Sequence, residues 1–190
     1  MGQDPRRLFR PGQIKMIDDA TLVAEEVTCN FFKLSFGEWK GLRYDIKTLA
    51  FLTEEEVAPG VLAHLVKYTS SPDQHTSRAS RIDFYRICLQ DHNILDALQR
   101  DRRIELTPLA LYVITHELVH IIRFSKFQQR FDLELRERIR EEMIVHNIST
   151  EILKPMNMPA LQSVLSAYDP LTARSSSTLD DQYLYAHDSF

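Results

Sequence analysis

Residues 109–124 form a largely apolar run that contains the pentad His116-Glu117-Leu118-Val119-His120. Apolar side chains on most sides of a helical repeat predict a buried, central helix. Thr107 is a good N-cap and Pro108 suits the first turn, so this helix should span about 108–126. Two imidazoles and a carboxylate in such a helix are costly to bury unless they bind something.

The spacing of the pentad suits a metal ion. His116 and His120 lie four positions apart, hence on one helix face, and imidazole nitrogens suit zinc at about 2.0–2.1 Å. Glu117 lies about 100° around the helix, beside the metal. Zinc lowers the pKa of a bound water to about 7, so Glu117 is predicted to act on zinc-bound water as general base and then as general acid.

Around this pentad the sequence resembles the zincin metallopeptidases. These enzymes tend to have a Val or Thr three positions before the first His, uncharged residues inside the motif and an apolar residue after it. The positions that comply are Val113, Ile114, Leu118, Val119, Ile121 and Ile122. The resemblance implies a zinc-dependent hydrolase, a metallopeptidase that acts on a peptide or protein substrate.

A catalytic zinc needs a third protein ligand and an open position. The metzincin pattern is absent, because Arg123 and Lys126 stand where its Gly and His would be. In the gluzincin arrangement, a glutamate comes from a second helix downstream. A helix predicted over 133–153 carries four candidates: Glu134, Glu137, Glu141 and Glu142.

Glu142 is the preferred third ligand. Glu134 and Glu137 sit in a charged, solvated segment, whereas Glu141 and Glu142 begin an apolar one. Glu142 also has apolar residues two and six positions on, as gluzincin ligands often do. Glu141 and His146 stay open as alternatives for this role.

Other roles of the same residues are possible. Tyr112 lies one turn before His116 and is either an oxyanion stabiliser or plain core, and Arg123 is a second candidate for that role. Alternatively, His116 and His120 are core histidines, and Glu117 pairs with an arginine such as Arg123.

Overall composition excludes some partners. The net charge of -4 gives no general attraction to nucleic acid, and the sequence has no apolar run long enough to span a membrane. Two cysteines without a C-x-x-C pair indicate free thiols, and the first residues lack an apolar signal core. We expect a cytoplasmic protein, with its oligomeric state left open.

We expect an α+β, helix-dominated fold, with the motif helix packed beside a small β-sheet. The predicted organisation is an irregular lead over 1–15, a single zincin-like domain over 16–170 and a mobile tail over 171–190. The expected elements are a helix from 18 or 19 to 35, a turn at 37–41, a strand at 44–52, a helix from 53 toward 68, a loop at 69–80, a strand or helix at 81–89, and a helix at 159–167.

Two further function classes remain. Glu117 and His120 form the Glu-x-x-His element of di-iron carboxylate bundles, but the nearest second copy, Glu142 to His146, is one residue too long. A zincin-like domain can also serve as a non-catalytic regulatory or binding module.

Overall fold

The computed structural model describes residues 7–69, 83–126 and 135–168. Its helices are α1 (Pro11–Phe31), α2 (Phe36–Gly41), α3 (Asp91–Arg100), α4 (Leu106–Lys126), α5 (Leu135–Leu153) and α6 (Pro159–Ala167). Its strands are β1 (Tyr44–Lys47), β2 (Ala63–Thr69) and β3 (Asp83–Leu89), and two 3₁₀ turns are η1 (Leu49–Phe51) and η2 (Glu54–Glu56). The predicted α+β, helix-dominated fold is confirmed.

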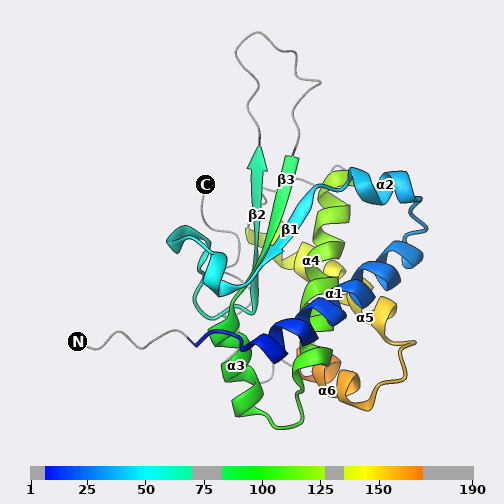
Figure 1. Ribbon diagram of the computed structural model, residues 1–190. Helices are drawn as coiled ribbons and strands as arrows, with labels where there is room; N and C mark the ends of the chain where they lie inside the picture. Colours follow the sequence, from blue (N-terminus) through cyan, green and yellow to red (C-terminus); the bar gives the residue numbers. More distant parts are fainter. Residues whose placement is uncertain (1–6, 70–82, 127–134, 169–190) are drawn as a thin grey trace.

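Helix α4 is the centre of the molecule, as its apolar sequence predicts. Every residue from Pro108 to Ile122 is buried. Helix α1 crosses α4 obliquely and packs against it (Figure 1). The buried positions of α1 include Ala20, Ala24 and Thr28, which recur every four residues and whose small side chains let two helices approach closely.

The small sheet lies beside α4 and has the strand order β1-β3-β2. Strand β1 pairs with β3 in parallel, and β2 pairs with β3 antiparallel, which places Leu65 opposite Ile87. Leu65, Tyr85 and Ile87 are buried in the same core cluster as α4. The predicted packing of the motif helix beside a small sheet is therefore confirmed.

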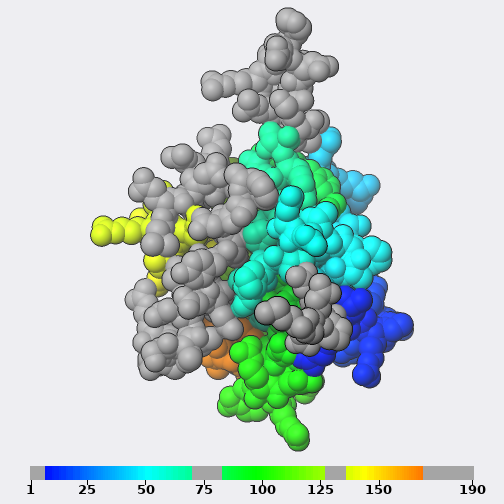
Figure 2. All heavy atoms as spheres, turned by 90° about the vertical axis from the view of Figure 1, so that its left-hand side faces the viewer, coloured from blue at the N-terminus to red at the C-terminus, as the bar shows by residue number. Residues whose placement is uncertain are grey.

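A segment with η1 and η2 covers the opposite face of the sheet. Arg86, which alternates with the buried Tyr85 and Ile87, forms ion pairs with Asp45 and with Glu56 of η2. Figure 2 shows this segment in cyan above α3 in green. Hydrogen bonds from the backbone N–H groups of Leu49 and Ala58 to the side chains of Asp91 and Gln90 hold this segment in place.

The first predicted helix has different ends in the structure. It begins at Pro11 rather than at residue 18, because proline suits the first helical position and the Gln13 side chain accepts a hydrogen bond from the Arg10 N–H. It ends at Phe31 rather than at 35, because Lys33 adopts a left-handed backbone with φ of 52°. The predicted irregular lead is therefore wrong for residues 11–15.

The predicted turn at 37–41 is instead the short helix α2. Ser35 caps it: the Glu38 N–H donates to Ser35 Oγ, and the Glu38 carboxylate accepts from the Ser35 N–H. This reciprocal pair satisfies two backbone donors at a helix start.

Two predictions between residues 44 and 68 are correct only at their starts. The strand predicted over 44–52 stops at Lys47, and the apolar run after it forms the turn η1. The helix predicted from 53 toward 68 is limited to η2, although its capping box between Thr53 and Glu56 is present. Gly60, with φ of 76°, turns the chain into strand β2, whose backbone donors and acceptors are taken by β3.

The later elements are closer to prediction. The strand alternative for 81–89 is confirmed by β3, helix α3 was not predicted, and α4 begins two residues earlier than expected. The predicted ends of α5 and α6, at 153 and 167, are confirmed. The loop predicted over 69–80 lies largely outside the described residues, and the tail predicted over 171–190 lies wholly outside them.

In the described ranges, none of the helices combines the length and the apolar character that a bilayer crossing requires.

Candidate metal centre

Helix α4 places the two pentad histidines side by side. Their Nε2 atoms are 3.2 Å apart, and both side chains are buried, with 8% of His116 and 2% of His120 exposed. The helix itself produces this proximity, because residues four apart lie one above the other on the same face. Phe124, one turn further on, stacks on the ring of His120 at 5.5 Å and closes that side of the pair.

Glu142 of α5 completes the group. Its Oε2 atom lies 3.1 Å from Nε2 of His116, and its Oε1 atom lies 3.2 Å from Nε2 of His120. In the described part of the chain, these three residues form the group of side chains that is able to hold a metal ion. The carboxylate comes from a helix separate in sequence, so the group depends on how α5 packs on α4.

The geometry of the three side chains fits a small divalent cation. Two nitrogens bound at about 2.1 Å to a tetrahedral zinc lie about 3.4 Å apart. The observed separation of 3.2 Å between the two Nε2 atoms is close to that value. Two imidazoles and one carboxylate are also a donor set that zinc accepts, and they leave a fourth position for water or substrate.

The three groups are electrostatically coupled. Burial alone would raise the pKa of Glu142, but the facing imidazoles of His120 and His116 hold that pKa well below its usual value. Burial lowers the pKa of His120, yet the carboxylates of Glu142, Glu117 and Glu141 together outweigh burial and raise that pKa overall. The Glu142 carboxylate and the His120 imidazole therefore stabilise each other's charged forms.

Glu117 lies beside this group on α4 and is 8% exposed. Burial raises the pKa of its carboxyl group, the two histidines lower it, and Glu142 raises it further. The charges of all three predicted ligands thus act on Glu117, which is not itself a member of the group.

The two alternative third ligands are engaged elsewhere. The Glu141 carboxylate accepts two hydrogen bonds from Arg123, from Nε at 2.5 Å and from a terminal nitrogen at 2.8 Å. His146 has its Nδ1 2.9 Å from the Tyr112 hydroxyl and its Nε2 3.4 Å from Thr150 Oγ1. The sequence alternative that paired Glu117 with Arg123 is wrong, because Arg123 binds Glu141.

Sequence reasoning identified Tyr112 as a neighbour of His116 but missed Phe124 and the Arg123–Glu141 ion pair. Tyr112 and Phe124 flank the histidines on α4, and the Tyr112 ring lies 5.9 Å from the His116 ring. For Phe124, its four-residue spacing from His120 was the available signal. The Arg123–Glu141 pair had no such signal, because it joins two helices.

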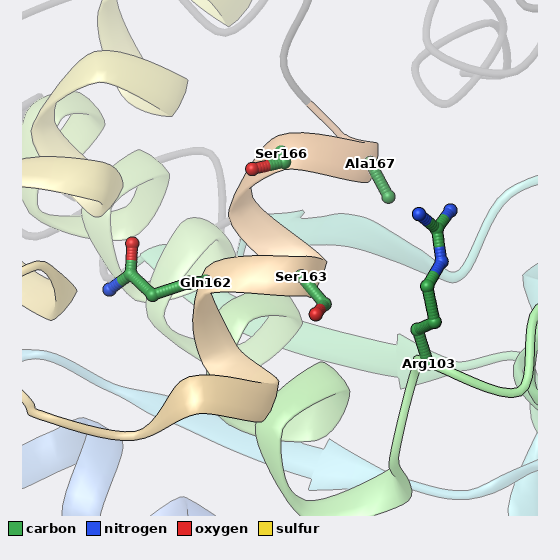
Figure 3. A pocket seen from close by; sticks show the side chains of 5 residues that line it. All are labelled: Arg103, Gln162, Ser163, Ser166 and Ala167. Atoms are coloured by element: carbon green, nitrogen blue, oxygen red, sulfur yellow. The ribbon is translucent and has the colours of Figure 1, made fainter.

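A separate hollow of about 380 Å³ lies beside α6. Its side chains do not converge on one point: Gln162 points away from Arg103 (Figure 3). None of the residues that line the hollow is buried, and the Arg103 side chain is 79% exposed and pairs with Asp101. None of its lining residues belongs to the metal-capable group, which consists of His116, His120 and Glu142, and we assign the hollow no function.

The chain was compared with protein-family models, with curated proteins and with solved structures, and it matches none of them. The assignment of function therefore depends on the geometry of the site.

Proposed function

We propose that the protein is a zinc-dependent hydrolase, a small metallopeptidase of gluzincin type in which His116, His120 and Glu142 hold the metal. The observation that carries this proposal is the close triangle of ligand atoms, with separations of 3.1–3.2 Å between the carboxylate and each imidazole and 3.2 Å between the imidazoles. Zinc held there supplies a Lewis acid that polarises a carbonyl group and acidifies water.

Glu117 is the proton carrier in this proposal. Its carboxylate takes a proton from the attacking water and returns it to the nitrogen of the leaving amine. Its place next to His116 on α4 orients the carboxylate beside the ligands rather than among them. The surrounding buried residues of α4 exclude bulk water from this transfer.

The position of strand β2 at one edge of the sheet favours a peptide as the substrate. In the described residues it pairs only with β3, so one edge of β2 carries backbone donors and acceptors without a strand partner. An extended peptide can add to such an edge by main-chain hydrogen bonds. The strand also contacts α4, which keeps this edge attached to the helix that bears the motif (Figure 1).

We place this activity in the cytoplasm. Cys29 and Cys88 both occur as free thiols, which suits a reducing compartment.

A non-catalytic zinc-binding module is the second candidate. The burial of His120 and Glu117, which are 2% and 8% exposed, favours it because a peptidase must admit its substrate to these groups. The di-iron alternative is weaker, because the metal-capable group in the described residues contains one carboxylate, whereas such bundles use four.

One experiment separates these functions. Purified protein is analysed for zinc and assayed on a fluorogenic peptide library with and without a chelator, alongside Glu117→Gln and the exposed control Glu105→Gln. A peptidase should hold about one zinc per chain, and Glu117→Gln should keep that zinc and lose hydrolysis. Zinc without hydrolysis in the wild type would favour the binding module, and absence of zinc would refute both.

A further inference from the structure

Arg123 and Glu141 form a largely buried ion pair between α4 and α5, next to His116, His120 and Glu142. The Glu141 side chain is 2% exposed and that of Arg123 is 16% exposed. Two nitrogens of the guanidinium group bind the two carboxylate oxygens, at 2.5 and 2.8 Å. Such a paired contact fixes the orientation of both side chains as well as their distance.

The contacts between α4 and α5 run in opposite order along the two helices. Tyr112 meets His146 near the start of α4, and Arg123 meets Glu141 near its end. Glu142 meets the two histidines between these two contacts. The helices are therefore antiparallel, and the Arg123–Glu141 pair lies directly beside the level of the ligands.

Neighbouring residues on a helix point about 100° apart. A rotation of α5 by that amount, with a shift of about 1.5 Å along its axis, would present Glu141 instead of Glu142 to the histidines. Apolar packing also opposes such a rotation, because the exposed Glu151 would take the place of the buried Ile152. The hydrogen bonds from Arg123 to Glu141 add a directional restraint at the level of the ligands, since rotation would leave a buried carboxylate and a largely buried guanidinium unpaired.

We propose that Arg123 and Glu141 are a positioning pair that fixes the rotation of α5, so that Glu142 rather than Glu141 completes the metal site. This inference rests on the proposed metal binding. Neither residue contacts the metal in this arrangement, and both act through Glu142. Buried ion pairs can often be replaced by apolar residues without loss of stability. The contribution of this pair is therefore the geometry of the ligand set rather than folding energy.

The test compares zinc affinity with the thermal stability of the zinc-free protein. In the double variant Arg123→Met/Glu141→Leu, zinc-free stability should stay near that of the wild type, and zinc affinity should fall about 10–100-fold, as for other residues that orient metal ligands. Affinity is measured by competition with a chromophoric chelator. The control is Asp45→Asn, which removes one partner of the Arg86 pair on the far side of the sheet and should leave zinc affinity unchanged.

Two further variants keep the test decisive if the double variant folds poorly. Arg123→Lys keeps the charge but cannot bind both oxygens in a fork, so it should weaken zinc binding to a smaller extent. In a Glu142→Ala background, Arg123→Lys should cause no additional loss, because the pair acts through Glu142.

Unchanged zinc affinity in both Arg123→Lys and the double variant would overturn the proposed positioning role alone. The same would follow if Arg123→Lys weakened zinc binding as much in the Glu142→Ala background as in the wild type. A wild type that binds no zinc would overturn the proposed function together with it.

Discussion

The hydroxyl oxygen of Tyr112 lies 2.9 Å from Nδ1 of His146, and this hydrogen bond joins α4 to α5 one turn before the metal-capable histidines. Tyr112 is 2% exposed, and its ring stacks on Tyr168 with ring centres 5.9 Å apart. These contacts indicate a core residue that ties two helices together, rather than a group that reaches a substrate.

Tyr112→Phe tests that role. Removal of the hydroxyl group should lower the free energy of unfolding by about 1 kcal/mol, the usual net value of one hydrogen bond. Chemical denaturation of the zinc-free protein measures it. If hydrolysis is lost while stability is unchanged, Tyr112 serves the reaction as an oxyanion stabiliser instead.

Zinc should stabilise the wild type against heat. A ligand at 100 times its dissociation constant adds about 2.7 kcal/mol to the stability of the folded state. His116→Ala and His120→Ala should lose this gain, because each removes one of three ligands. His92→Ala, on α3 and outside the group, should keep it. Thermal scans with and without zinc make the measurement, and a full zinc-dependent gain in His116→Ala would refute the ligand assignment.

Asp91→Ala should be strongly destabilising. The Asp91 carboxylate is 1% exposed and accepts hydrogen bonds from the backbone N–H groups of Phe9, at 3.0 Å, and Leu49, at 2.9 Å. Two buried donors would lose their acceptor, at about 1–3 kcal/mol each. The exposed Asp96 on the same helix pairs with Arg7, and Asp96→Ala should cost about 0–1 kcal/mol. Similar losses in both variants, measured by urea denaturation, would contradict this explanation.

Glu56 should make stability depend on pH in the acid range. Burial raises the pKa of Glu56, but hydrogen bonds from Tyr68, from the Thr53 N–H and from Arg86 outweigh it and hold the pKa below its usual 4.5. A lowered pKa in the folded state means that this stabilisation is full above pH 4.5 and is lost as pH falls through the folded pKa. Glu56→Gln should therefore show a shallower loss of stability below pH 4.5.

The neighbouring exposed residue provides the control for that measurement. Glu55→Gln should follow the wild-type pH profile. If Glu56→Gln also follows that profile, the Glu56 contacts do not stabilise the fold.

Lys33→Gly should stabilise the protein. Lys33 has a left-handed backbone just after α1. The Lys33 N–H donates to the Asn30 carbonyl oxygen, and the Leu34 N–H donates to the Cys29 carbonyl oxygen. Glycine adopts this conformation without a steric penalty, so a gain of up to about 1 kcal/mol is expected. Lys33→Ala is the control and should give no such gain. Equal stability of Lys33→Gly and Lys33→Ala would refute the explanation.

The sequence alone determined the elements whose interactions are local. The buried helix α4, the closeness of His116 and His120 and the end of α5 before Pro155 all follow from helical periodicity and backbone chemistry, which act within a few residues. The sequence also favoured Glu142 over Glu141 as the candidate third ligand, because apolar residues follow it on α5.

Tertiary structure decided whatever depends on partners distant in the chain. Residues 63–69 form a strand because β3 supplies their hydrogen bonds, although their sequence permits a helix. Arg123 of α4 forms an ion pair with Glu141 of α5, and no periodicity in the sequence indicates this pairing. The partners in these hydrogen bonds and ion pairs are far apart in the sequence and meet only when the elements pack, so local sequence patterns do not predict them.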